Sequence, residues 1–515
     1  MRTARRISQI LFLLFFIFLF FQARFPYETA IPSDLFLRAS PLVAISTFIA
    51  SRAFASTLVL ALIVLALTVP LGRFFCGWVC PLGTTIDASD SLIKRKHKKP
   101  KERESLRFRS WKFAILIFVL AASVFSVQFI WFFDPIALLT RTLTAAIYPA
   151  FAFVLSGMFD VLFSLGILED TVYSTYNFAQ NTVLPIEQPE MYQSILIFGI
   201  FIGILALGMV TRRFWCRNLC PLGALLGIFS KWRLTKRYVS DACTECSLCQ
   251  RGCPMNAIED DYSINNTVEC IECADCVAVC PPNAVSYKLG KNPGKNEIDL
   301  SKRRLLQAGA AGIVGVSLIK TAGADPKNEG KAIRPPGVAD EDEFLDKCIR
   351  CQECVRICAT TGGCLQPAML ESGWEGMWTP ISVPRVGYCE YNCNLCGQVC
   401  PTGAIANLTL EEKKEIKMGQ AYFNKNRCIP WYSKEDCLVC EEHCPTPDKA
   451  IKFDVREARA PDGSTRVVKF PYVDEELCIG CGICENKCPV VGKAGVFVTS
   501  SGNERTQQQS DNPYA

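Results

Sequence analysis

The stretch Ser301 to Ala324, SKRRLLQAGAAGIVGVSLIKTAGA, stands between two parts of the chain that differ in composition. It contains the adjacent arginines Arg303 and Arg304, a mildly apolar run rich in Gly and Ala, and then Ala322-Gly323-Ala324. A basic start, an apolar run and small residues in this order are typical of an export signal, although such a signal normally begins a chain. The stretch therefore predicts a twin-arginine signal or anchor inside the chain, with the residues after Ala324 exported.

A cytoplasmic linker is the alternative interpretation of this stretch. The two arginines would then be ordinary basic residues, and the apolar run would be a buried helix, because it is short and rich in Gly for a membrane span. Its glycines, Gly309, Gly312 and Gly315, do not match the GxGxxG spacing of a dinucleotide-binding turn, and no strand precedes them.

The composition indicates a membrane protein with soluble domains. Half of the 515 residues are apolar, and they are concentrated in about the first 210 positions. The formal net charge of +5 decides little, because the basic residues lie in loops beside apolar runs, where they orient spans. We expect the membrane as a partner and no nucleic acid.

The first part of the chain predicts an α-helical membrane domain of about four spans, with both of its ends in the cytoplasm. Arg2, Arg5 and Arg6 precede the first span, and no small-residue cleavage site follows it, so that span is an anchor. The basic loop Lys94–Lys112 fixes the orientation. The four spans are Ile7–Phe21, about Ala53–Leu71, Phe113–Phe133 and about Ile195–Val210.

Residues 136–168 are apolar but contain Arg141, Pro149 and Asp160, a pattern that favours helices at the outer surface or a re-entrant hairpin and leaves two further spans open. Asp134 precedes this region. It is either a proton acceptor for quinol or a helix stop before Pro135, and we favour the helix stop.

The second and fourth spans end in an internal repeat, RFFCGWVCPLG (Arg73–Gly83) and RFWCRNLCPLG (Arg213–Gly223). Cysteines four apart share a helix face, so the four thiols of these CxxxCP motifs are predicted to converge at the cytoplasmic edge as a metal or redox site. In the alternative they are small packing residues, and a proline ends each helix. The four are Cys76, Cys80, Cys216 and Cys220.

Two runs of the form CxxCxxCxxxCP follow and predict a cytoplasmic two-cluster ferredoxin domain. In such domains the fourth cysteine of each run ligates the other 4Fe-4S cluster. A zinc ion needs only four ligands, so zinc does not explain doubled runs that end in Cys-Pro. The spacing also differs from that of a small disulfide-bonded scaffold. The predicted sets are Cys243, Cys246, Cys249 and Cys280, and Cys270, Cys273, Cys276 and Cys253.

Four more runs follow the signal, and they predict four further clusters by the same crossed rule. Cys358 is followed by Ala instead of Pro, so Cys364 is either an alternative ligand or a spare buried thiol. The sets are Cys348, Cys351, Cys354 and Cys400; Cys389, Cys393, Cys396 and Cys358; Cys428, Cys437, Cys440 and Cys488; and Cys478, Cys481, Cys484 and Cys444.

The six sets use 24 of the 29 cysteines and leave Cys364 and the CxxxCP thiols. Clusters are assembled on folded protein, so a signal for export of folded protein suits such a chain. Haem is not expected, because His97 lies in a basic loop, His443 lies inside a cysteine run, and no CxxCH occurs.

The predicted fold is thus an α-helical membrane domain followed by α+β bacterial-type ferredoxin domains. The expected parts are a membrane domain (1–235), a cytoplasmic ferredoxin domain (236–295), the signal or anchor (296–325), a linker (326–345), two further two-cluster domains (346–415 and 416–499) and a disordered tail (500–515).

The chain resembles two known protein families. The multi-span part, with its CxxxCP motifs and two-cluster domain, resembles the NapH membrane subunit. The part after the signal, with GYCEYNCNLCGQVCPTGAI (Gly387–Ile405), resembles the NapG and MauM periplasmic ferredoxins. The resemblance covers nearly the whole chain and implies a fusion that takes electrons from the quinone pool to a periplasmic reductase, such as nitrate reductase, or a cytochrome.

The function expected from these features is electron relay at the inner membrane, from quinol through the clusters to a periplasmic acceptor. We find no nucleophile and base pair, no nicotinamide fingerprint and no flavin motif. Two alternatives stay open: a conduit from a cytoplasmic ferredoxin that does not use quinol, and an accessory electron donor that maintains or matures a metalloenzyme.

Overall fold

The computed structural model describes residues 2–93, 108–166, 169–185, 191–259, 261–290, 302–323, 332–369, 371–461 and 463–503. His97, most of the basic loop, the two ends of the signal stretch and most of the polar tail lie outside these ranges. The chain forms two compact units, and neither is continuous in sequence. Unit 1 comprises Met1–Phe21, Ala30–Leu143 and Ile195–Leu318, and unit 2 comprises Gln22–Thr29, Thr144–Ser194 and Ile319–Ala515.

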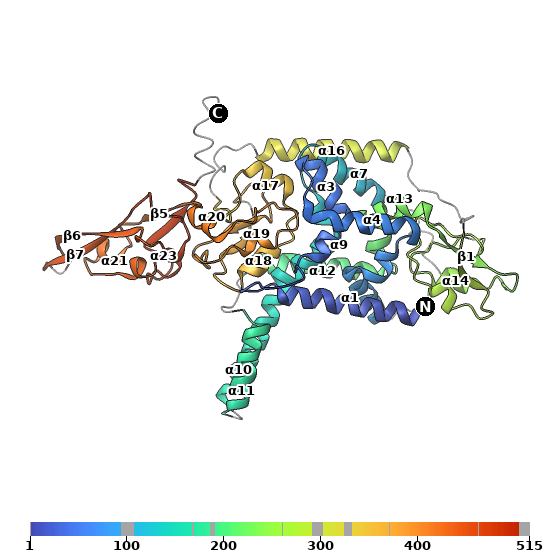
Figure 1. The fold of residues 1–515 in the computed structure, drawn as a ribbon, viewed down its shortest axis with the longest axis horizontal. Coiled ribbons are helices and arrows are strands. Elements are labelled where there is room, and N and C mark those ends of the chain that lie inside the picture. The colour runs from blue at the N-terminus through green and yellow to red at the C-terminus, as the bar shows by residue number, and fades with distance from the viewer. Residues whose placement is uncertain are drawn as a thin grey trace. The chain divides into compact units, whose positions relative to one another are not determined.

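Unit 1 contains most of the apolar helices of the first part of the chain (Figure 1). Helices α3, α4, α7 and α13 pack on one another around fully buried side chains such as Leu42. The helices of this part are α1 (Arg2–Gln22), α2 (Leu35–Arg38), α3 (Pro41–Ser51), α4 (Val59–Leu71), α5 (Pro81–Leu92), α7 (Trp111–Val124), α8 (Ile130–Phe133), α9 (Pro135–Thr142), α12 (Ser194–Ala206) and α13 (Pro221–Phe229).

Two helices in the described residues are long and apolar enough to cross a membrane, Arg2–Gln22 and Pro135–Ser164. The first contains the predicted span Ile7–Phe21. The other three predicted spans correspond to shorter apolar helices, Ser56–Leu71, Trp111–Val124 and Ser194–Met209. The predicted span Phe113–Phe133 is interrupted, because α7 ends at Val124 and Ser126 adopts a left-handed conformation.

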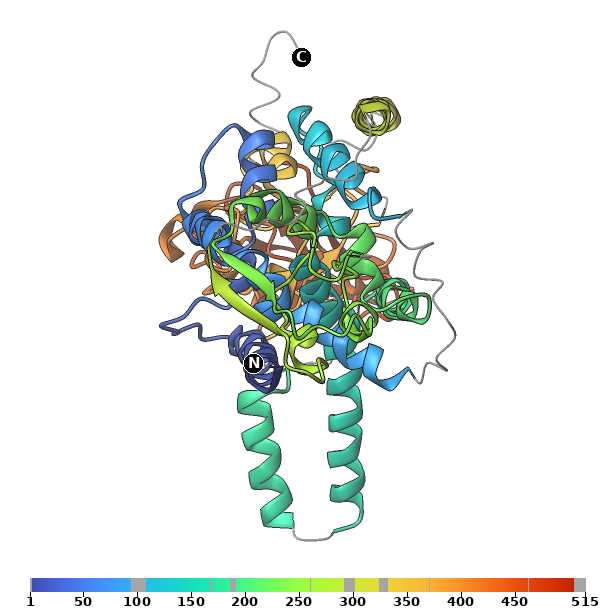
Figure 2. The same cartoon turned by 90° about the vertical axis from the view of Figure 1, so that its right-hand side faces the viewer.

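The region expected to form surface helices or a re-entrant hairpin contains the second of these long helices. The residues that suggested a break do not break it. Arg141 is buried and donates to the Trp131 carbonyl oxygen at 2.9 Å. Pro149 lies in the first turn of α10 (Tyr148–Ser164), after a π-helical turn, Leu143–Ile147. Helix α11 (Glu169–Thr182) lies beside α10, with the Phe159 and Tyr176 rings 5.3 Å apart (Figure 2).

Asp134 caps a helix, as favoured from the sequence. Its carboxylate accepts hydrogen bonds from the backbone N–H groups of Ile136 and Ala137 at 3.0 and 2.9 Å and from the Ser40 hydroxyl at 2.8 Å. The side chain is fully buried at the start of α9. These three donors make Asp134 an N-cap.

The first ferredoxin domain also belongs to unit 1. Its strands β1 (Thr235–Val239) and β2 (Val285–Leu289) pair antiparallel, from Thr235 opposite Leu289 to Val239 opposite Val285. They enclose the cysteine runs and the short helices α14 (Leu248–Gly252) and α15 (Asp275–Ala278). The signal stretch forms the 22-residue helix α16 (Lys302–Gly323).

Unit 2 holds the other two ferredoxin modules, built from short elements and two-stranded antiparallel sheets. The sheets pair β3 with β4, β5 with β8, and β6 with β7. The elements are α17 (Glu341–Lys347), α18 (Glu353–Cys358), β3 (Leu365–Pro367), β4 (Pro380–Ser382), α19 (Leu395–Gln398), α20 (Leu410–Glu415), β5 (Gln420–Phe423), α21 (Ile429–Tyr432), α22 (Val439–Glu442), β6 (Ile451–Arg459), β7 (Thr465–Val473), α23 (Ile483–Asn486) and β8 (Val496–Thr499).

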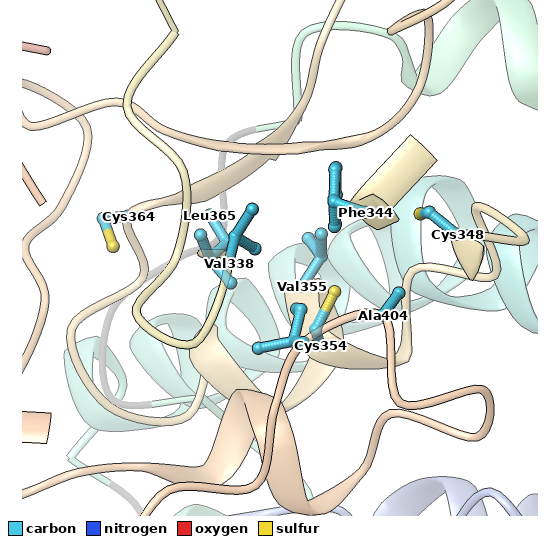
Figure 3. Packing of buried hydrophobic residues seen from close by; sticks show 9 residues of the cluster. Val338, Phe344, Cys348, Cys354, Val355, Cys364, Leu365 and Ala404 are labelled. Carbon is cyan, nitrogen blue, oxygen red and sulfur yellow. The ribbon is translucent and has the colours of Figure 1, made fainter. Parts of the chain in front are cut away.

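The end of the expected linker is packed into the first of these modules. Val338 and Phe344 belong to a core cluster that also contains cysteines of the following run (Figure 3). Arg334 is buried, donates to the Pro380 carbonyl oxygen at 3.0 Å and forms an ion pair with Glu341. From residue 332 onward the chain is therefore part of the folded module, and the apolar side chains that the linker composition obscured provide its core.

Two segments from the first part of the chain pack onto the same module. The Phe25 N–H donates to the Thr360 hydroxyl at 3.0 Å, and Tyr27 packs against a buried cluster that contains Ile357. The Arg356 guanidinium lies 4.0 Å from the centre of the Tyr148 ring. The module of Cys348 to Cys400 is thus built partly from residues 22–29 and 144–194.

Candidate iron-sulfur centres

Five cavities in the structure are each lined by all four cysteines of one predicted set. In every one, three thiols come from one run and the fourth from its partner run, as the crossed rule predicts. The cavities contain Cys243, Cys246, Cys249 and Cys280; Cys253, Cys270, Cys273 and Cys276; Cys348, Cys351, Cys354 and Cys400; Cys358, Cys389, Cys393 and Cys396; and Cys444, Cys478, Cys481 and Cys484.

The sixth predicted set gathers around Cys440. Burial raises the pKa of its thiol, and the nearby thiols of Cys488, Cys428 and Cys437 raise it further. All 29 cysteines of the chain are free thiols. The structure therefore brings five of the six predicted sets together, and Gly495 contacts both Cys428 and Cys488 of the sixth. The role of these cysteines as cluster ligands stays a prediction.

A recurring backbone conformation shapes four of the runs. In each, the second residue after the first cysteine and the residue after the second cysteine have positive φ. This conformation turns successive N–H groups toward one concave side, which favours an anionic ligand. The residues are Glu245 and Ser247, Glu272 and Ala274, Arg350 and Gln352, and Gly480 and Gly482.

Many of the thiols at these sites are buried, so their ionised form needs a positive partner such as iron. Burial raises the pKa of Cys273, Cys354 and Cys484 well above the usual range of a thiol. A buried thiolate needs a positive partner, which iron supplies. Within the described residues, no three His, Cys, Asp or Glu side chains are placed to hold a single metal ion. Four thiols arranged around a cavity, too far apart for one ion, fit a cluster, whose several iron atoms would each take one thiol.

Backbone amides complete several sites. The fourth cysteine of three runs accepts a backbone hydrogen bond at its sulfur: Ala257 donates to Cys253 at 3.3 Å, Ile405 to Cys400 at 3.5 Å, and Gly495 to Cys488 at 3.2 Å. Cys364 lies in the same cavity as Cys358, with the two sulfurs 3.9 Å apart. A hydrogen bond from Cys364 lowers the pKa of Cys358, so Cys364 is placed as a partner of a predicted ligand.

Two side chains that the sequence analysis missed contact ligand sulfurs in the first ferredoxin domain. Arg237 on β1 is buried and donates to the Cys249 sulfur at 3.5 Å. The Tyr287 hydroxyl on β2 lies 3.9 Å from the Cys270 sulfur and 3.8 Å from the Cys276 sulfur. Hydrogen bonds to sulfur tune the reduction potential of a cluster.

The CxxxCP motifs have a geometry different from the expected single helix face. In each, a π-helical turn (Phe75–Val79 or Trp215–Leu219) is followed by a break at the second cysteine. Cys80 and Cys220 are N-caps, and their sulfurs accept hydrogen bonds from Gly83 and Gly223 at 3.4 Å. Pro81 and Pro221 therefore start the next helices, α5 and α13, instead of ending the preceding ones. Proline favours the first turn of a helix, where its missing N–H has no partner to lose.

Comparisons with known proteins agree with these sites. A family model described as a 4Fe-4S binding domain matches residues 53–100 and 193–240, and another model of that description matches residues 471–491. A model described as a 4Fe-4S dicluster domain matches residues 235–281 and 262–359. No solved structure matches the chain.

Several curated proteins are similar to part of the chain. The methylamine utilization ferredoxin-type protein MauM of Methylorubrum extorquens is 32% identical over 210 residues, which are 40% of this chain and 90% of that protein. MauM of Paracoccus denitrificans is 34% identical over 207 residues, which are 38% of this chain and 86% of that protein. The ferredoxin-type protein NapG of Escherichia coli is 33% identical over 197 residues, which are 36% of this chain and 80% of that protein.

Replacing Tyr287 by Phe should lower the reduction potential of the centre at Cys253, Cys270, Cys273 and Cys276. Loss of a hydrogen bond worth about 1 kcal/mol corresponds to about 40 mV for a one-electron couple. A redox titration followed by electron paramagnetic resonance (EPR) measures the shift. Replacing Tyr432 by Phe is the control, because Tyr432 is 66% exposed. Equal potentials in the Tyr287 variant and the wild type would show that the hydroxyl has no influence on the centre.

Proposed function

Because the chain belongs to the family of the NapG and MauM ferredoxin-type proteins, and is thus an iron–sulfur electron-transfer protein, we propose that it carries electrons from membrane quinol to a redox acceptor in the periplasm. The proposal places the first ferredoxin domain in the cytoplasm and the last two modules outside. The main support is that the ferredoxin domains contact different segments of the first 235 residues.

The first ferredoxin domain contacts segments predicted to be cytoplasmic. The Trp78 indole N–H donates to the Glu272 carbonyl oxygen at 3.0 Å, and Arg109 donates to the Asn256 carbonyl oxygen at 2.6 Å. Near the N-terminus, Arg5 forms an ion pair with Asp275 at 3.5 Å. Each partner lies at the cytoplasmic end of a predicted span.

The module of Cys348 to Cys400 contacts segments predicted to be outside. Phe25 and Tyr27 follow the first span, and Tyr148 lies between the third and fourth. Gln193 directly precedes the fourth span and donates to the Pro367 carbonyl oxygen at 2.8 Å. Contacts sorted in this way support a chain whose two ferredoxin parts lie on opposite sides of a membrane.

The signal stretch then crosses between the sides. Helix α16 has 22 residues, or about 33 Å at 1.5 Å per residue, which is the length of a span, but it is not among the two described helices that are also apolar enough to cross a membrane. Ala308, Gly312 and Val316 form its buried stripe. A Cβ atom at Gly312 would lie 3.1 Å from the Ala121 side chain of α7, so glycine permits close helix packing. This packing supports a signal that is retained as an anchor beside α7.

The centres of the last two modules form a series. The Cys389 N–H donates to the Cys481 carbonyl oxygen at 2.8 Å, so the two middle sets are neighbours across the module boundary. Each 4Fe-4S cluster takes up and releases one electron at a time. Because residues 22–29 and 144–194 contact the module that holds Cys348, that module is the entry, and the set around Cys440 is the exit.

A conduit from a cytoplasmic ferredoxin is the second candidate function. One observation favours it: the Asp134 carboxylate, the acidic group considered for quinol, is held by three hydrogen-bond donors as a helix cap. An electron path that starts at the first ferredoxin domain needs no quinol site.

Quinol added to the full-length chain in anaerobic liposomes should reduce the clusters, as followed by EPR, and then a soluble cytochrome c used as a probe. The Cys440→Ser variant should keep quinol-dependent reduction of the other clusters but pass electrons to cytochrome c at least about tenfold more slowly, because the exit set is incomplete. Reduction by ferredoxin but not by quinol would replace the quinol proposal with the conduit.

Replacing both Arg303 and Arg304 by Lys keeps the charge and removes the guanidinium geometry that an arginine-reading receptor needs. A protease-accessible tag placed after Ser500 should move from the periplasm to the cytoplasm, while the membrane part inserts as before. Lys302→Arg is the matched control and should leave the tag outside. A cytoplasmic tag in the unmutated protein would end the export proposal and favour an accessory role.

A further inference from the structure

The segments matched by the 4Fe-4S model at residues 53–100 and 193–240 each contain only two cysteines. A 4Fe-4S cluster takes four cysteine ligands. Neither segment can therefore hold a cluster alone, but the two together supply four thiols, Cys76, Cys80, Cys216 and Cys220.

We propose that the two repeats share one further 4Fe-4S cluster, a seventh centre, ligated by the four CxxxCP thiols. The presence of this centre does not depend on the electron donor or acceptor. Its part in electron transfer rests on the proposed function.

The four thiols occupy equivalent positions in the two repeats. Cys80 and Cys220 are the N-caps of α5 and α13, and their sulfurs accept hydrogen bonds from the Gly83 and Gly223 N–H groups at 3.4 Å. Cys76 and Cys216 also pack against one buried cluster, which places both repeats at the same spot.

Two buried arginines are exchanged between the repeats. Arg213 of the second repeat donates to the carbonyl oxygens of Cys76 and Gly83 in the first, at 3.1 and 3.3 Å. Arg73 of the first repeat reaches the equivalent turn of the second, where a Cβ atom at Gly223 would lie 2.6 Å from its Nη2. Each CPLG turn thus meets the guanidinium of the other repeat, an arrangement with approximate twofold symmetry.

Among the residues that the structure describes, the buried charges around these turns are not balanced. Asp87 pairs with Arg213, with its oxygens 2.6 and 2.7 Å from the Nε and Nη2 atoms. Arg73 instead shares Glu269 with Lys112 and Arg109, so one carboxylate faces three cations. Arg73 is fully buried, and its Nε and Nη2 atoms have no hydrogen-bond partner in the described residues. Excess buried positive charge is stabilised by a nearby anion, and a 4Fe-4S cluster with four thiolate ligands is an anion.

A second orphaned polar group lies between the cysteines of the second repeat. The Asn218 side chain is 1% exposed, and neither its amide nitrogen nor its oxygen has a hydrogen-bond partner within the described part of the chain. Its equivalent in the first repeat, Trp78, is bound to the first ferredoxin domain. The Asn218 amide and the Arg73 N–H groups could donate hydrogen bonds to the sulfur atoms of a cluster.

The seventh centre would lie beside the cluster of Cys253, Cys270, Cys273 and Cys276. Cys76 and Cys216 pack against the buried group that contains Cys273. This approach depends on Gly77, because a Cβ atom there would lie 2.3 Å from the Ile271 carbonyl oxygen. In transfer between the two centres, one loses an electron and the other gains it, and no atom moves.

Iron and acid-labile sulfide analysis of the anaerobically purified full-length chain tests the proposal. Seven cubanes predict about 28 iron atoms, whereas the six sets alone predict about 24. Cys80→Ala and Cys220→Ala should each lose about four irons and one EPR signal. Ser91→Ala, at an exposed position of α5, is the control and should keep the full number.

About 24 irons in the wild type, with no change in the two cysteine variants, would overturn the seventh centre and leave the six predicted clusters intact. A metal other than iron at the four thiols would also overturn it. The wild-type count needs no variant, so the result stands even if the substitutions impair folding. Failure of quinol oxidation, by contrast, leaves the iron count unchanged and bears only on the proposed function.

Discussion

The crossed origin of the fourth thiol is the constraint on which the ferredoxin parts of this molecule depend. Each cavity takes three cysteines from one run and one from its partner, so neither run can complete a site alone. Burial raises the pKa values of Cys273 and Cys354, so binding of iron would favour the ionised form that a ligand needs. Folding of paired runs and binding of iron are therefore coupled. A chain that carried its clusters across a membrane would have to cross it folded, which is the physical reason for proposing a twin-arginine signal at Arg303 and Arg304.

A second constraint is a group of buried charges beside the CxxxCP repeats. Arg73, Lys112 and Glu269 are buried together, and Glu269 directly precedes the predicted ligand Cys270. Removing one member would leave an uncompensated buried charge, which costs about 3–5 kcal/mol. This network connects the CxxxCP repeats to the first ferredoxin domain, and the exchanged arginines connect the repeats to each other. The first ferredoxin domain is thereby held against the part of the chain that contains the two CxxxCP repeats.

The spacing CxxCxxCxxxCP predicts both the loop and the crossed partner, and the grouping of five sets around cavities follows that prediction. Arg237 and Tyr287 were not predictable, because they reach the sulfurs from paired strands and carry no spacing signal. The helix from Pro135 to Ser164 was missed because Arg141 and Pro149 suggest breaks, while Trp131 and a π-helical turn accommodate them. The π-helical turns also explain why cysteines four apart do not share one helix face. Packing of residues 22–29 against the Cys348 module joins segments more than 300 positions apart, and no local pattern records it.

Electron transfer across a sealed bilayer tests the central claim most directly. The full-length chain would be inserted in liposomes with the first ferredoxin domain outward, an orientation checked by protease accessibility, and oxidised cytochrome c would be trapped inside. Dithionite, which does not cross the bilayer, is added outside. We expect the trapped cytochrome c to be reduced at a rate that rises with the amount of protein, and we expect no reduction in protein-free vesicles. Reduced clusters in the outer domain, together with cytochrome c that stays oxidised, would contradict it.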